Sequence, residues 1–174
     1  MKNLPERRLG VMLLALTFLL AGLAPAVYAK LNDPQELIPF LKVELPGWKL
    51  AEGYPQANRL QDKERSFVQA VGVFSSGKST ISAFIKEGEI AKEVAMFKIL
   101  KEKNDNEKDN SREISFQGLT AVEMVMKNKK LAFLFILVTD HCLVTMKVTE
   151  AEDTKVLKEL GNKIDLSKLA ALVK

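Results

Sequence analysis

Hydrophobic and polar residues alternate along several segments of the chain with the two-residue period of β-strands. Residues 66–74 and 80–86 form the first such pair, and the short link at residues 75–78 predicts a β-hairpin. Pairing Phe74 with Ser79 places the apolar residues of both strands on one face, made of Val68, Ala70, Gly72, Ile81, Ala83 and Ile85. The alternation therefore predicts an antiparallel strand pair with one core-facing side.

Three more strands are predicted at residues 120–126, 131–138 and 141–148, the last two joined by a two-residue turn at Thr139 and Asp140. That turn sets the facing residues, which are Phe133 with Met146, Phe135 with Val144, and Leu137 with Cys142. The opposite face of the first of these strands is also apolar, with Ala132, Leu134, Ile136 and Val138. A strand with two apolar faces needs cover on both, either from helices on each side of the sheet or from a partner on one side.

Helical segments are predicted before, between and after these strands. Asp33, followed by a proline, marks a helix start near the beginning of the mature chain. Residues 89–100 carry apolar side chains near helical spacing. Thr149 and Glu152 form a capping box that predicts a third helix from Thr149, and residues 166–173 form a shorter fourth one.

The remaining segments change this picture little. The charged run at residues 101–113 predicts a solvated loop, and the single tryptophan, Trp48, is expected in the core. No internal repeat and no long Pro/Gly/Ser-rich linker divides the chain. The fold class predicted is therefore α+β, with a mainly antiparallel sheet of about five to seven strands and helices packed on one or both faces.

The start of the chain predicts export. Basic residues lead into the apolar stretch at residues 9–23, which is followed by Pro25 and the small-residue pattern Val27-Tyr28-Ala29. We interpret residues 1–29 as a secretory signal peptide cleaved after Ala29, and residues 30–174 as one α+β domain. The protein is then expected to be periplasmic or secreted, and a membrane attachment would arise only through an uncleaved leader.

Composition and charge exclude several classes of protein. The chain has 174 residues, of which 47% are hydrophobic and 28% charged, unlike collagen-like, disulfide-dense or disordered chains. The leader carries three basic residues and one acidic residue, so its removal lowers the net charge from +4 to about +2. No basic stripe interleaved with aromatic residues remains, so nucleic acid is not expected as a partner. Cys142 is the only cysteine, which precludes an intramolecular disulfide.

Residues 72–79, Gly-Val-Phe-Ser-Ser-Gly-Lys-Ser, match the phosphate-binding loop pattern G-x-x-x-x-G-K-[ST]. Such a loop needs a helix that begins at Lys78 and Ser79, so that its N-terminus faces the phosphate. Residues 80–85 instead alternate like a strand. We therefore expect a hairpin turn here and no bound nucleotide.

No catalytic or metal site is predicted. His141 and Cys142 are adjacent, so on a strand their side chains point to opposite faces and cannot act as base and nucleophile. Cys142 is expected to be a buried structural thiol and His141 to be solvated. One histidine and one cysteine cannot supply the usual zinc ligands, and the acidic run at residues 105–109 lacks the glycine and closing glutamate of a calcium loop. No cofactor is expected.

Candidate binding residues come from strand parity and from residue type. Four apolar residues fall opposite the expected core face of their strands, and two methionines lie where they would line an adaptable pocket for a lipid or a partner segment. The six candidates are Val71, Val73, Phe84, Leu143, Met124 and Met126.

Several segments of the chain resemble a family of small exported bacterial α+β domains whose function is uncharacterised. The similar segments are Leu-Pro-Gly-Trp at residues 45–48, the strands around residues 76–78, the strand at residues 134–138 and the helical ending at residues 157–169. More distantly, the order of strands and helices resembles the compact domains of the PsbP/Mog1-like type. Those domains are mostly binding or assembly modules, so the resemblance implies binding and transfers no site residues.

These observations favour a non-catalytic binding or accessory module of the bacterial cell envelope, which binds an envelope protein or a second copy of itself. One alternative is a carrier of a small apolar ligand in a cavity behind the methionines. Another is a hydrolase that uses carboxylates. An uncovered apolar sheet face would favour the protein binder. A buried pair of carboxylates in a cleft would favour the enzyme, and a core without a cavity would exclude the carrier.

Overall fold

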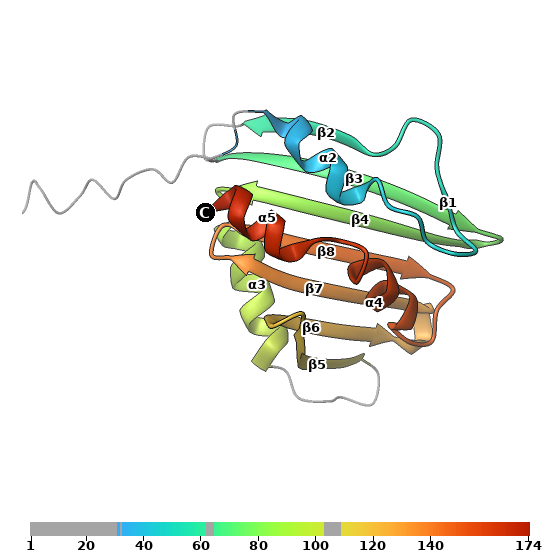
Figure 1. Ribbon diagram of the computed structural model, residues 1–174. Coiled ribbons are helices and arrows are strands. Elements are labelled where there is room, and N and C mark those ends of the chain that lie inside the picture. The colour runs from blue at the N-terminus through green and yellow to red at the C-terminus, as the bar shows by residue number, and fades with distance from the viewer. Residues whose placement is uncertain (1–30, 32, 62–64, 103–108) are drawn as a thin grey trace, which may run out of the picture.

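The computed structural model describes residues 31, 33–61, 65–102 and 109–174 (Figure 1). The predicted leader, residues 1–29, lies outside the described residues, as do residues 105–108 of the acidic run, whose last residue, Asp109, begins β5. Within the described residues no helix has the length and the apolar character needed to cross a membrane.

The core of the molecule is one antiparallel sheet of eight strands. Their spatial order is β1-β3-β4-β8-β7-β6-β5, and β2 pairs with the same edge of β3 as β1 does. The prediction of an α+β fold with a mainly antiparallel sheet is confirmed. The strands are β1 (Lys49–Leu50), β2 (Gln56–Gln61), β3 (Ser66–Ser76), β4 (Ser79–Gly88), β5 (Asp109–Phe116), β6 (Leu119–Met126), β7 (Leu131–Thr139) and β8 (Cys142–Thr149).

Helices cover both faces of the sheet. Figure 1 shows α2, α4 and α5 in front of the sheet and α3 behind it. We call these two sides the core face and the α3 face. The helical elements are η1 (Pro34–Leu37), α2 (Ile38–Leu41), α3 (Ala91–Glu102), η2 (Lys127–Lys129), α4 (Lys155–Gly161) and α5 (Leu166–Val173).

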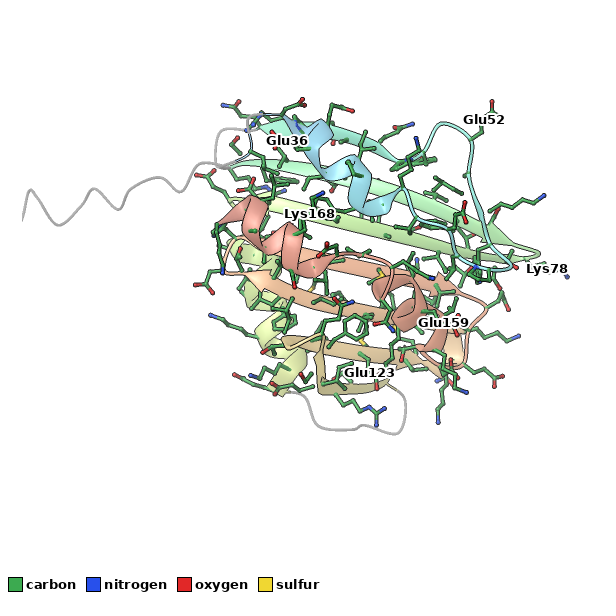
Figure 2. All side chains as sticks on the ribbon, in the orientation of Figure 1. Glu36, Glu52, Lys78, Glu123, Glu159 and Lys168 are labelled. Carbon is green, nitrogen blue, oxygen red and sulfur yellow. The ribbon has the colours of Figure 1, made fainter. Side chains whose placement is uncertain are left out.

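The hairpin of β3 and β4 has a shorter loop than predicted. Ser76 pairs with Ser79, so only Gly77 and Lys78 form the loop, and Phe74 faces Ile81. This shift of two residues leaves every side chain on its predicted face, because side chains alternate with period two. Gly77 has a positive φ of 57°, which suits a two-residue hairpin loop. Figure 2 shows Lys78 at the tip of this hairpin, where no helix begins.

The hairpin of β7 and β8 is displaced by one residue from its predicted register. A bulge between Leu137 and Thr139 places an extra residue in β7 before the turn. Because a one-residue shift moves side chains to the other face, the predicted partners lie on opposite sides of the sheet. The observed pairs are Phe133 with Lys147, Phe135 with Thr145, and Leu137 with Leu143. The apolar face of β8, with Cys142, Val144 and Met146, belongs to the core face.

The ends of the helices follow the sequence in part. The Asp33 side chain accepts a hydrogen bond from the Gln35 amide, as a cap at the predicted helix start would. The predicted capping box at Thr149 is wrong, because Thr149 ends β8 and its hydroxyl accepts the amide of Thr80 at 2.9 Å. α4 begins later, at Lys155. The prediction of a loop at residues 101–113 is wrong at both ends, because α3 continues to residue 102 and residues 109–113 belong to β5.

Two hydrophobic clusters hold the layers together. The larger one lies on the core face beneath α2, α4 and α5, and Trp48 packs against it while remaining partly exposed. Its largest fully buried members include Phe74, Leu37, Leu41, Ile81, Ile85, Leu134, Ile136, Met146, Leu157 and Leu160. The smaller one lies beneath α3 and consists of Phe67, Ile90, Val94, Phe97, Val122, Phe135 and Leu143. The requirement for cover on both faces of β7 is thus met by helices.

Close packing of α4 on the sheet predicts a steric effect at Gly161. A Cβ at this position would lie 2.9 Å from the Phe116 ring and 3.2 Å from the Met146 Cε. We expect Gly161→Ala to lower the free energy of unfolding by about 1–3 kcal/mol, measured by urea denaturation. Gly72→Ala is the control, since its Cβ would make ordinary contacts at 3.4 Å. Adding Phe116→Leu should restore part of the loss, and a Gly161→Ala variant as stable as wild type would contradict the packing argument.

Candidate functional site

α3 covers only part of its face of the sheet. Its contacts are with β5, β6 and β7, and its cluster reaches β3 and β8 only through Phe67 and Leu143. Of the described helices, no other one packs on this face. The uncovered part carries six partly exposed residues, which we call the open sheet face: Val71, Val73, Ser82, Phe84, Thr145 and Lys147.

The strand register places these six residues in two neighbouring rows. Val71, Phe84 and Thr145 form the first row across β3, β4 and β8. The second row runs through Val73, Ser82 and Lys147, and continues on β7. The open sheet face is therefore a continuous surface three strands wide, with apolar side chains on β3 and β4 and polar ones towards β8.

The structure brings three of the six predicted binding residues together. Val71, Val73 and Phe84 lie side by side on the open sheet face. Leu143 lies on the same side of the sheet as Phe84, but α3 covers it, so it belongs to the smaller cluster and has 2% exposure. A binding role for Leu143 therefore requires a surface that α3 already covers.

The methionines do not line a common pocket. Met124 is partly buried and packs against the cluster beneath α3, and Met126 lies at the end of the same strand. Met146 is fully buried on the opposite side of the sheet, within the larger cluster. These positions fill cores on two different faces, which weakens the prediction of an adaptable methionine-lined cavity.

Lys147 is the charged member of the open sheet face. It is partly buried, and in its row it lies between Ser82 and Phe133. It forms no ion pair with any residue of the described part of the chain. Sequence reasoning missed this residue, because a lysine in an alternating strand is ordinarily a solvated position.

An ion cluster marks the border between α3 and the open sheet face. Glu93 of α3 pairs with Lys86 at 3.0 Å and with Arg65 at 3.5 Å. Both cations also lie over the Phe67 ring, at 5.2–5.3 Å from its centroid. Burial alone would raise the pKa of Glu93, but the hydrogen bond and charge of Lys86, with Arg65, outweigh it and lower the pKa. These pairs hold the start of α3 against β4.

Glu123 is a buried carboxylate on the core face of β6, with 5% exposure. Lys158 of α4 pairs with it at 2.6 Å, the Thr154 hydroxyl donates to it at 2.5 Å, and Arg112 of β5 also pairs with it. A hollow of about 250 Å³ adjoins the group and is lined in addition by Lys127, Glu152 and Asp153, among others. Figure 2 shows Glu123 below α4.

The partners of Glu123 decide its chemistry. Burial alone would raise the pKa of this carboxyl, but hydrogen bonds from Lys158, Thr154 and Arg112 outweigh it and lower the pKa. Glu123 is thus held as an anion and linked to two cations, an arrangement that fastens α4 and β5 to β6 and suits a proton donor poorly. The signal missed in the sequence is its position, in phase with the core residues Ala121 and Val125.

Cys142 and His141 have different environments. Cys142 is fully buried, and burial together with the nearby Glu87 carboxylate raises the pKa of its thiol. The prediction of a buried structural thiol is confirmed. The prediction of a solvated histidine is wrong, because His141 Nε2 donates to the carbonyl of Val173 at 2.7 Å. This contact joins the β7–β8 turn to the end of α5.

Two hollows lie on the helical side and meet at Lys163. Each has a volume of about 610–620 Å³. Figure 2 shows Glu36 and Lys168 on the two sides of the first hollow. Phe40 and Leu172 contribute apolar surface to the first hollow, and Leu45, Trp48 and Leu50 contribute it to the second. Side chains of both charges surround these hollows, so no single ligand chemistry is favoured. Among the described residues, no group of three or more His, Cys, Asp or Glu side chains is arranged to hold a metal ion.

Comparison with protein-family models, with curated proteins and with solved structures found no match.

The ion pairs of Glu123 predict a pH-dependent stability. A carboxyl whose folded pKa is lowered contributes stability that is present above its unfolded pKa, near 4.5, and is lost as pH falls through the folded value. We expect Glu123→Gln to lower the free energy of unfolding by about 2 kcal/mol at neutral pH. The difference in the free energy of unfolding between the variant and the wild type should decrease as pH falls below 4.5. Glu150→Gln, at an exposed pair with Lys130, is the control. If urea denaturation gives the same difference in the free energy of unfolding at all these pH values, Glu123 does not have a lowered pKa in the folded protein.

Burial of Cys142 predicts slow alkylation in the folded protein. Iodoacetamide reacts with the thiolate, which the raised pKa disfavours, and the side chain has no exposed surface. We expect labelling at least about tenfold slower in the native protein than in denaturant, followed by intact mass spectrometry. Equal rates in the two states would show that the thiol is accessible.

Proposed function

We propose that this chain is a non-catalytic exported binding module of the bacterial cell envelope and that the open sheet face is its contact surface. The single observation that carries the proposal is the apolar group Val71, Val73 and Phe84, which is contiguous, partly exposed and free of any described helix. A contiguous exposed apolar surface on a folded domain commonly marks an interaction site.

The outer side of α3 enlarges the apolar surface on this side of the molecule. Met96 and Ile99 are exposed to 48% and 57%, and both project from the helix that borders the open sheet face. A stable interface requires about 800 Å² from each partner, more than three side chains supply. We therefore include this side of α3 in the proposed contact.

The two alternative functions have weaker support. A hydrolase would need two convergent carboxyl groups, one of which stays protonated to act as the acid. Glu123 and Asp153 line one hollow, but their partners lower the pKa of both carboxyl groups, which suits neither for that role. A carrier would need an enclosed apolar cavity, whereas Met124 and Met146 lie on opposite faces. We keep the carrier as an outcome of the test below.

Site-specific photo-crosslinking tests the proposal. A benzophenone amino acid replaces Phe84 on the open sheet face, and in a second variant it replaces Lys168, which is exposed on the opposite side. In cells of an expressing bacterium, we expect one discrete crosslinked protein from position 84 and none from position 168. Adding Val73→Glu should reduce that crosslink at least about tenfold, because a buried charge without a partner opposes association.

The control for Val73→Glu is the melting temperature, which should stay close to that of wild type because Val73 is a partly exposed position. Crosslinks from position 168 alone would place the contact on the helical side and refute the proposal. Native mass spectrometry of the protein isolated from the same envelope distinguishes a carrier of a small ligand from a protein-binding module. A small bound mass that leaves on activation, with no protein partner, would favour a carrier instead.

A further inference from the structure

We infer that the segment bound on the open sheet face belongs to a different protein and carries a carboxylate that pairs with Lys147. This inference rests on the proposed function, and it names the chemistry of the partner. It is drawn from the charge pattern of the surface rather than from its apolar residues.

Lys147 lies at the β8 end of its row, between Ser82 of the open sheet face and Phe133, which packs against the cluster beneath α3. A partner that covers the whole row from Val73 to Lys147 also removes water from this ammonium group. Dehydrating a charge is unfavourable unless an opposite charge or hydrogen-bond acceptors replace the water. Because Lys147 has no ion pair within the described part of the chain, the partner has to supply the counter-charge.

Hydroxyl groups beside Lys147 complete an anion-binding pattern. Thr145 precedes it by two residues on the same face of β8, and Ser82 is its partner on β4. Both side chains can donate hydrogen bonds, as the ammonium group does. Three donors beside an apolar surface suit one carboxylate on an otherwise apolar segment.

A second copy of this chain fits the surface poorly. A two-fold contact through the open sheet face would bring the same lysine from both copies into one interface. The six residues of this face include no carboxylate. Glu93, an acidic group at its border, is already held by Lys86 and Arg65. Self-association through this face would therefore leave like charges unneutralised.

Peptide selection tests the charge. A random-peptide phage library is panned on the protein purified from the envelope of an expressing bacterium, as wild type, as Lys147→Glu and as Lys168→Glu. We expect wild type and Lys168→Glu to enrich peptides with Asp or Glu at one position among apolar residues. Lys147→Glu should enrich Lys or Arg there, and should bind the wild-type peptides at least about tenfold more weakly. Melting temperatures of the variants control for folding.

The outcomes separate this inference from the proposed function. The selected peptides could lose binding to Val73→Glu, yet lack a preferred acidic residue and bind Lys147→Glu as well as wild type. This result would overturn the inference and leave the open sheet face as a binding surface. Selected peptides that ignore both substitutions would refute the proposed function itself. Sedimentation velocity tests the second copy: a concentration-dependent dimer of wild type that Val73→Glu dissociates would also overturn the inference.

Discussion

The two apolar faces of β7 are the constraint on which the rest of the structure depends. Ala132, Leu134 and Ile136 point to one side, and Phe133 and Phe135 point to the other. Neither side of this strand can be left to water, so the sheet needs a layer of helices on each. α4 and α5 supply one layer and α3 the other, which places β7 near the middle of a three-layer arrangement.

The lengths of the elements explain why one face stays partly open. α3 has 12 residues and spans about 18 Å, whereas seven strand positions at about 4.8 Å spacing make a sheet nearly 30 Å wide. One helix cannot cover that width, and the strands most apolar on this side, β6 and β7, lie beneath it. The strands left outside, β3 and β4 above all, mix valine and phenylalanine with serine and glutamine, a composition that tolerates partial exposure.

The accuracy with which the sequence predicted the face of each strand residue depended on whether the error in register was an even or an odd number of residues. The faces of β3 and β4 were predicted correctly although the predicted register was wrong by two residues, because an even shift leaves each side chain on the same face. The positions of Val73 and Phe84 on the α3 face were predicted for this reason. The bulge in β7 is one residue, an odd shift, and it places Phe133, Phe135 and Leu137 on the side opposite their predicted partners of β8. Leu143 is on its predicted side of the sheet, and it is buried because α3 covers it. β5 could not be predicted, because its charged residues are typical of a solvated loop. The environments of Lys147 and Glu123 could not be predicted either, because they depend on residues far away in the sequence, such as Ser82 and Lys158.

The two edges of the sheet bear on how this protein behaves when it is concentrated. Unpaired edge strands are the usual starting point for strand-by-strand polymerisation. Here the β3 edge is divided between the two-residue β1 and the polar β2, and the opposite edge strand carries Arg112 and Glu113. Both features oppose the addition of another strand. The chain thus keeps the open sheet face partly exposed while the edges of its sheet oppose growth into fibrils.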